Sequence, residues 1–305
     1  MRDIFYIDRL TKKTEKERVY GAFFLNLLYG EGVLVRWMSP LLRILIAKVG
    51  KISSFYGHIQ KMGWSRYKIM PFIKKFHVDE TEFLEPVESF HSFNDFFIRR
   101  LQPSARPLAP GNDIAILPAD GRYLVFQNLA RCEGFFVKGV CFSLEQFLLE
   151  RPLSETYRQG SMAIARLCPS DYHRFHFPCN CLPQKVKEIP GDLYSVNPNA
   201  LRKDGDILTK NKRACTTLLS KPFGQIAYIE VGATYVGTIH QTFIPGELYA
   251  KGDEKGYFSF GGSCIVLLFE PGRIQFDQDL IEASQKGIEV RGLLGQTLGR
   301  SLVPY

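Results

Sequence analysis

The spacing of apolar residues divides this chain into two parts with different periods. In the first hundred residues, apolar side chains recur at helical intervals behind signals that start helices. Thr14 and Ser92 are each followed three residues later by an acidic residue, which is the spacing of a capping box. Ser39-Pro40 has the form of an N-cap followed by a first helical position. We therefore expect helices to begin at Thr14, Ser39 and Ser92.

Beyond a proline-rich stretch at residues 102–110, the pattern changes to short apolar runs separated by Gly and Pro. One more helix is expected from Ser143 to Glu150. The expected strands are Ile114–Leu117, Tyr123–Phe126, Met162–Leu167, Lys185–Ile189, Gln225–Val231, Thr234–Ile239 and Cys264–Phe269. Many short strands with few helices between them favour a mainly antiparallel sandwich or barrel-like body. The sequence thus predicts an α+β protein, with a helical region over residues 1–103 and a β-rich domain over residues 104–305.

Positive charge is concentrated in the predicted helical region. The chain has a formal net charge of +8, and residues 1–80, with 15 basic and 7 acidic side chains, supply all of it. A helical region with apolar and basic faces suits an anionic membrane surface. The alternative is a helix that packs on its own protein and exposes a basic face to water. No nucleic-acid-binding motif accompanies the charge, so we expect no nucleic-acid partner.

The sequence contains no good candidate for a membrane span. The longest stretch without Asp, Glu, Lys or Arg runs from Val231 to Gly246, shorter and more polar than the roughly 20 apolar residues that a span requires. The first residues carry Asp3 and Asp8, unlike a secretory signal. Seven scattered cysteines are typical of reduced thiols in the cytosol. We therefore expect a peripheral protein at the cytoplasmic face of the cell membrane.

Three short segments contain candidate chemical groups. Asp120 lies in a predicted turn, His173 and His176 are three residues apart, and Ser263 follows two glycines. Each has a plainer structural interpretation: a turn, a structural histidine pair and a glycine-rich hairpin. The histidine spacing would place both rings on one side of a helical turn, as an acid and base or as metal ligands. Nearby cysteines make zinc an alternative, but no paired Cys-x-x-Cys supports it.

Together, Asp120, His176 and Ser263 are the residue types of a serine nucleophile activated by a histidine. The nucleophile elbow of serine hydrolases is not indicated, because Ile265 stands where that turn has glycine. A hydroxyl next to Gly-Gly has another possible target, the carbonyl of the preceding residue. Ser263 could attack Gly262 and convert that amide to an ester, because glycine tolerates strained backbone angles and lets the hydroxyl approach.

Five ordered blocks closely resemble the phosphatidylserine decarboxylases, which are pyruvoyl-dependent proenzymes. The blocks are Ser92-Phe93-Asn94-Asp95-Phe96-Phe97-Ile98-Arg99, Pro118-Ala119-Asp120-Gly121, Asp171-Tyr172-His173-Arg174-Phe175-His176, Pro190-Gly191-Asp192-Leu193-Tyr194-Ser195-Val196-Asn197 and Gly261-Gly262-Ser263. The resemblance runs in order from Ser92 to the C-terminus, and more loosely through the basic N-terminal region. One position departs from the family pattern, since Cys264 stands where the family usually has threonine.

The resemblance implies self-cleavage between Gly262 and Ser263, with Asp120 holding the ring of His176 and His176 taking the proton of Ser263. The products would be a large chain, residues 1–262, and a small chain, residues 263–305, associated as a heterodimer or a higher oligomer. Ser263 would become a covalent pyruvoyl group, whose Schiff base with phosphatidylserine serves as the electron sink for loss of carbon dioxide. His173 is similar in position to the family histidine of the decarboxylation step. No metal would be needed.

Three other functions remain open at this stage. A hydrolase would use the same three residues on an external ester and would stay a single chain. A lipid-binding protein that never matures would stay whole and would not react with serine-directed probes. A pyruvoyl decarboxylase of a soluble amino acid would be cut, but its basic N-terminal region would have no explanation. We expect that removing residues 1–80 releases the protein from lipid and leaves self-cleavage largely intact.

Overall fold

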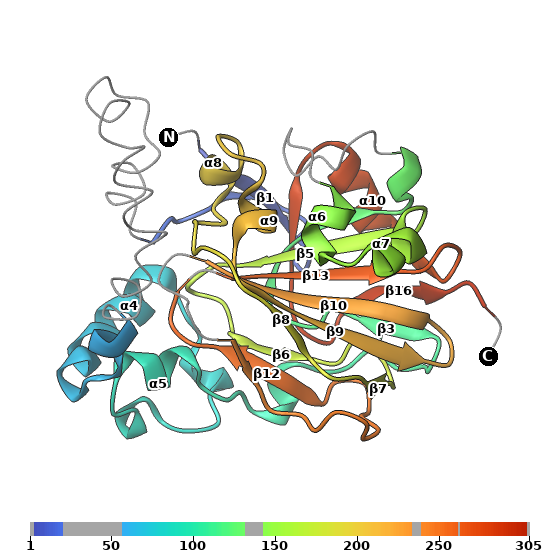
Figure 1. Cartoon of the computed structure of the whole chain (residues 1–305). Coiled ribbons are helices and arrows are strands. Elements are labelled where there is room, and N and C mark those ends of the chain that lie inside the picture. Colours follow the sequence, from blue (N-terminus) through green and yellow to red (C-terminus); the bar gives the residue numbers. More distant parts are fainter. Residues whose placement is uncertain (1–2, 21–56, 132–142, 234–238, 262, 304–305) are drawn as a thin grey trace.

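The computed structural model describes residues 3–20, 57–131, 143–233, 239–261 and 263–303 (Figure 1). Its largest element is a ten-stranded sheet in the order β2-β1-β15-β4-β5-β13-β10-β9-β7, with β8 also paired to β9. Every pair in this sheet is antiparallel except β1 with β15. The strands are β1 (Phe5–Asp8), β2 (Thr14–Lys16), β4 (Gly121–Phe126), β5 (Ser161–Leu167), β7 (Leu182–Pro183), β8 (Lys187–Ile189), β9 (Arg213–Ser220), β10 (Gly224–Gly232), β13 (Ser263–Phe269) and β15 (Glu289–Gly292).

Two three-stranded sheets accompany the large one. The first has the order β11-β12-β6 and the second β14-β16-β3. Their strands are β3 (Ile114–Ile116), β6 (Arg174–His176), β11 (Ile239–Gln241), β12 (Glu254–Phe258), β14 (Ile274–Phe276) and β16 (Thr297–Ser301). Within the described ranges all three sheets are open, so the fold is α+β and mainly antiparallel, as expected, but the barrel-like alternative is not observed.

Alternation along β13 divides the core into two layers, because successive side chains of a strand point to opposite faces. Ile265 and Leu267 pack in one cluster with Phe175 of β6 and Phe258 of β12. Cys264, Val266 and Leu268 pack in the other cluster, beneath four short helices. These helices are α6 (Leu144–Leu148), α7 (Arg151–Tyr157), α8 (Pro198–Leu201) and α9 (Ile207–Lys210), and α10 (Gln278–Gln285) packs on β4 and β15.

Residues 57–105 form a phenylalanine-rich cluster of helices and turns beside the β6-β12 sheet (Figure 1). Phe72, Phe93, Phe96 and Phe97 pack there against Phe260, which directly follows the β12 region of the chain. The helices and turns are η1 (Gly63–Lys68), α4 (Ile69–Phe76), η2 (Glu80–Glu82), η3 (Val87–Ser89), α5 (Phe93–Phe97) and η4 (Pro103–Ala105), and η5 (Leu129–Arg131) lies further along the chain.

The helix expected at Thr14 is wrong. Thr14–Lys16 is strand β2, paired with β1 at the edge of the large sheet, and the side chain of Glu17 is buried against two arginines instead of capping a helix. The helix expected at Ser92 is confirmed as α5, where Ser92 Oγ accepts the Asp95 N–H at 3.1 Å. The helix expected at Ser39 lies outside the described residues. Among the described helices, none is long and apolar enough to cross a membrane.

Most predicted β-domain elements are present. The helix expected after Ser143 is α6, and β3, β4, β5, β8, β10 and β13 correspond to six of the predicted strands. The strand expected over Thr234–Ile239 falls mostly outside the described residues. The helical turn expected to hold His173 and His176 is wrong, because Arg174–His176 is strand β6, held by pairing with β12.

Candidate active site

Ser263 is the first residue of the central strand β13. Its neighbours in register are Leu167, the last residue of β5, and Gly232, the last residue of β10. The side chain is fully buried, and Oγ has no hydrogen-bond partner among the described residues. By alternation, the hydroxyl lies on the face of Ile265, toward the β6-β12 sheet. Gly262 lies outside the described residues.

His173 and His176 lie on the segment that follows β5. The backbone N–H of His176 donates to Pro118 O at 2.8 Å, two residues before Asp120, and His173 O accepts the Phe258 N–H at 3.0 Å. The ring Nδ1 of His176 lies 2.9 Å from Gly252 O, and the ring Nδ1 of His173 lies 2.9 Å from Asp171 O. Since a carbonyl only accepts, each Nδ1 carries the proton and each Nε2 carries a lone pair.

Both imidazoles are neutral at neutral pH. Burial lowers the pKa of His173 to about 4, and the charge of Asp171 opposes this only in part. Burial also lowers the pKa of His176, against the opposing effects of the Gly252 carbonyl and the charges of Glu254 and Asp120. Neither Nε2 has a hydrogen-bond partner among the described residues. The described residues therefore include two unpaired proton acceptors, His173 Nε2 and His176 Nε2, and one unpaired hydroxyl, Ser263 Oγ.

Asp120 lies in the turn between β3 and β4, where it bonds to groups other than His176. Arg106 donates from Nε and Nη2 to its carboxylate, at 3.0 Å and 2.7 Å, and the Leu294 N–H donates at 2.8 Å. The described residues contain no hydrogen bond between Asp120 and His176, so the proposed role of Asp120 is electrostatic in this structure: its charge raises the pKa of His176 against the larger effect of burial.

Helix α5 holds the segment that leads to Ser263. Asn94 Oδ1 accepts the Phe260 N–H at 3.2 Å, and the rings of Phe93 and Phe97 lie 5.2 and 5.0 Å from that of Phe260. Phe97 also lies against His173, with ring centroids 3.9 Å apart. Sequence reasoning missed Asn94, because the N–H that it accepts lies 166 residues further along the chain.

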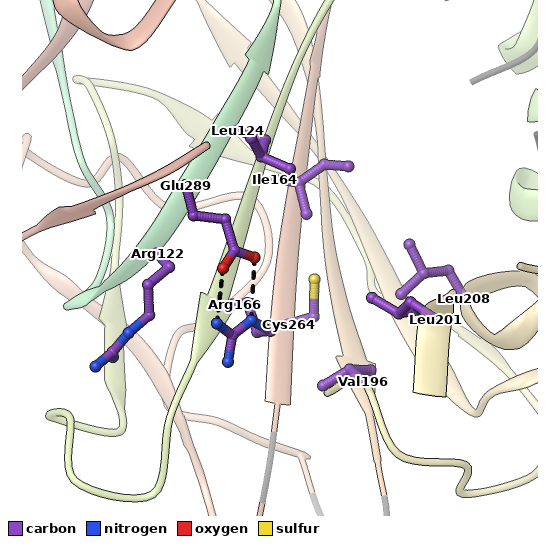
Figure 2. Close-up of a pocket in the computed structure, with 9 residues that line it drawn as sticks. All are labelled: Arg122, Leu124, Ile164, Arg166, Val196, Leu201, Leu208, Cys264 and Glu289. Atoms are coloured by element: carbon purple, nitrogen blue, oxygen red, sulfur yellow. Dashed lines mark hydrogen bonds and ion pairs between the residues drawn. The ribbon is translucent and has the colours of Figure 1, made fainter. Parts of the chain in front are cut away.

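On the opposite face of β13, Cys264 lies next to a buried cluster of charges. Arg166, which pairs in register with Cys264, donates to both oxygens of Glu289, at 3.1 and 2.8 Å (Figure 2). The same guanidinium bonds to Glu17, and Arg122 bonds to Asp171. The cavity of about 10 Å³ beside Cys264 has room for one water molecule. Burial raises the pKa of Cys264 to about 12, so it is a thiol at neutral pH.

The described residues do not assemble a metal site. Within those ranges, no three His, Cys, Asp or Glu side chains are grouped as metal ligands. Of the cysteines considered for zinc, Cys168 accepts a hydrogen bond from Arg166, and Cys179 and Cys181 are buried in the core between the sheets. The alternative of a zinc site therefore has no support here.

Comparison with known proteins identifies the family of this chain. Residues 93–300 match the family model described as phosphatidylserine decarboxylase. A phosphatidylserine decarboxylase proenzyme of Chlamydia pneumoniae is 45% identical over 296 residues, covering 97% of each chain. One of Chlamydia felis (strain Fe/C-56) is 46% identical over 302 residues, covering 99% of each chain. This chain belongs to the phosphatidylserine decarboxylase family.

Proposed function

We propose that this chain is a proenzyme that cuts itself between Gly262 and Ser263 and then decarboxylates phosphatidylserine to phosphatidylethanolamine and carbon dioxide. The observation that carries the proposal is the Ser263 hydroxyl, which is fully buried and has no hydrogen-bond partner among the described residues. A buried hydroxyl without a hydrogen-bond partner costs free energy of folding, and a catalytic role explains why the fold keeps one.

In the proposed cleavage, Ser263 Oγ attacks the Gly262 carbonyl carbon and its proton moves to Nε2 of His176. The amide C–N bond breaks as His176 passes that proton to the leaving nitrogen, and the acyl group is now an ester on Oγ. Elimination then removes the Cα proton of residue 263 and breaks its Cβ–Oγ bond, which leaves Gly262 as a new carboxylate and residue 263 as dehydroalanine. Addition of one water and loss of ammonia give the pyruvoyl group. His176 is suited to the first step because its Nε2 holds a lone pair in the folded chain.

The residues present fit a pyruvoyl group at position 263. Ser263 Oγ has no hydrogen bond to a described residue, so none would have to break when this oxygen leaves. When formed, the ketone holds the substrate amine and accepts the electrons released as carbon dioxide leaves. Phe97 packs on one face of His173 and excludes water from it. We assign His173 to the decarboxylation step; its Nε2 must gain a proton before it donates one, because its pKa is about 4.

The two products should stay together as a heterodimer. The small chain, residues 263–305, would contain β13, which lies between β5 and β10, and β15, which lies between β1 and β4. Its backbone hydrogen bonds to the large chain therefore remain after cleavage. The bond that is cut precedes a strand and does not interrupt one.

We also propose that the chain binds at the cytoplasmic face of the membrane, and the surface features of residues 57–76 support binding to a membrane surface. Trp64 and Tyr67 are exposed by 52% and 66%, and the Lys68 ammonium lies 5.2 and 5.9 Å from their ring centroids. Aromatic rings with adjacent lysines are suited to an interface with anionic lipids, among them phosphatidylserine itself. The excess charge of residues 1–80 has the same sign.

The function is tested by incubating the purified chain with vesicles that contain phosphatidylserine and measuring phosphatidylethanolamine. The wild type and Ser259→Ala, a serine four residues earlier, should form product, whereas Ser263→Ala should not. An uncut wild-type chain that is labelled by a fluorophosphonate would favour the hydrolase. An uncut and unlabelled chain that still binds lipid would favour the lipid-binding protein. A cut chain that decarboxylates only free serine would favour the soluble amino acid.

A further inference from the structure

Arg99 is a buried arginine whose charge has no partner among the described residues. It directly follows Ile98, the C-cap of α5, and only 5% of its surface is exposed. The only hydrogen bond of its side chain to a described residue is from Nη1 to Phe96 O, at a long 3.3 Å. Nε has no acceptor, and none of the described carboxylates forms an ion pair with the guanidinium.

Three other buried or nearly buried arginines among the described residues each bond to several acceptors. Arg213 donates to four backbone carbonyls, Arg166 bonds to two glutamates, and Arg106 bonds to Glu82 and Asp120. A guanidinium has five N–H donors, and a buried charge is disfavoured unless it is paired. Burial lowers the pKa of Arg99 to about 10, which still leaves it protonated at neutral pH. Its donors are therefore available to a ligand.

Two phenylalanines orient this guanidinium. It lies over the rings of Phe83 and Phe96, 5.1 and 4.8 Å from their centroids. Contact with a ring occupies a face of the planar guanidinium, so its N–H donors remain at the edge. The edge is the side that binds two oxygens of a carboxylate or phosphate at once.

Arg99 belongs to the candidate active site. The residue before it, Ile98, accepts a 2.9 Å hydrogen bond from Arg174 Nε, and Phe97 lies against His173. Helix α5 accordingly lies beside β6 and β12 (Figure 1). The charge of Arg99 also lowers the pKa of His173, and Asp120 is the acid that acts most strongly on Arg99. Asp120 does not neutralise it, because Arg106 and Leu294 already bond to that carboxylate.

We propose that Arg99 binds the phosphodiester of the lipid headgroup through paired N–H···O bonds. This assignment rests on the proposed function, which supplies a substrate with two anionic groups. The carboxylate is the poorer candidate, because it loses its negative charge as carbon dioxide leaves. A cation bonded to it would stabilise the bound substrate more than the transition state. The phosphodiester keeps its charge throughout the reaction. Arg99 should therefore contribute equally to binding the substrate and the transition state.

The test compares Arg99→Gln and Arg99→Lys with Arg100→Gln, which changes the exposed neighbouring arginine. Intact mass first shows whether each chain is cut, so that maturation is scored separately from turnover. Steady-state decarboxylation of a short-chain phosphatidylserine then gives kcat and KM. We expect Arg99→Gln to raise KM roughly 10- to 100-fold with kcat little changed. Arg99→Lys should lie between it and the wild type, and Arg100→Gln should match the wild type.

Competition identifies the anionic group. Glycerophosphoethanolamine, which has the phosphodiester and no carboxylate, should inhibit the wild type competitively and Arg99→Gln much more weakly. Free serine and inorganic phosphate should inhibit both weakly. An unchanged KM in Arg99→Gln, serine inhibition that depends on Arg99, or equally strong inhibition by inorganic phosphate would each overturn the assignment.

Two further outcomes are also decisive. If the Arg99 variants stay uncut, the test uses the wild type alone. Competitive inhibition of the wild type by glycerophosphoethanolamine would support the assignment, and no inhibition would overturn it. If the wild type is cut but inactive on phosphatidylserine, the proposed function fails instead. Calorimetric binding of glycerophosphoethanolamine to the cut wild type, compared with Arg100→Gln and Arg99→Gln, then still tests Arg99.

Discussion

At the scale of single residues, the candidate site depends on two histidines that the fold keeps neutral. Each donates Nδ1–H to a backbone carbonyl, and each leaves Nε2 without a partner among the described residues. The sequence placed these histidines in the site by resemblance, but it did not show their tautomers. Tautomers depend on which carbonyl lies beside the ring, and Gly252 is 76 residues away from His176 along the chain.

Because the fold keeps His173 neutral, the free energy of unfolding should depend on pH. The unfolded chain binds a proton at the ordinary histidine pKa near 6.5, whereas the folded chain does so only near pH 4. The stability that this residue contributes is therefore present above about pH 6.5 and is lost as the pH falls toward 4. Between pH 7.5 and 5, the loss should be about 2 kcal/mol.

Urea unfolding of the uncut Ser263→Ala chain at both pH values measures this loss. Replacing His173 with Gln in that background should remove about 2 kcal/mol of the pH dependence, and replacing the exposed His91 with Gln should not. Equal pH dependence in both double variants would show that His173 is not held neutral by the fold.

At the scale of elements, α5 links the phenylalanine-rich cluster to the segment before the cleavage site. Its cap at Ser92 was readable from sequence because a capping box is a local signal. Its function was not readable, because the bond from Phe260 N to Asn94 joins residues 166 apart. The same limit explains the error at Thr14, where a local helix signal was overridden by pairing with β1 and by distant arginines.

Asn94 should be a positioning residue for self-cleavage. Asn94→Leu removes the acceptor of a buried N–H, which costs about 1–3 kcal/mol, and leaves the segment before Gly262 less firmly held. We expect slower conversion of newly made chain to the two products, followed on denaturing gels. Asn94→Asp keeps an acceptor oxygen and should be cut at closer to the wild-type rate. Wild-type cleavage by Asn94→Leu would contradict this role.

At the scale of the whole molecule, the N-terminal segment is part of the sheet that holds the site. Residues 3–20 supply β1 and β2 and the buried Glu17, and residues 69–73 pack in the cluster that contains Phe260. The expectation that residues 1–80 can be removed without loss of cleavage therefore no longer follows. The charge asymmetry was visible in the sequence, but composition does not show which basic segment joins a sheet.

Glu17→Gln tests this integration. The substitution leaves Arg166 and Arg122 with less buried negative charge, and breaking such a pair costs about 3–5 kcal/mol. We expect that loss in the free energy of unfolding of the uncut Ser263→Ala chain, measured with urea. Glu88→Gln, at an exposed glutamate, is the matched control. A loss below about 1 kcal/mol would show that residues 3–20 are not needed to stabilise the sheet.

The central claim is that the chain cuts itself at Gly262–Ser263 and forms a pyruvoyl group there. Intact mass spectrometry of the denatured wild-type protein, beside Ser263→Ala, tests it most directly. We predict two wild-type chains, residues 1–262 and 263–305, with the small chain starting in a ketone in place of the serine amine, and a single chain from Ser263→Ala. A wild-type protein that stays whole, or a small chain that keeps its serine amine, would contradict the account.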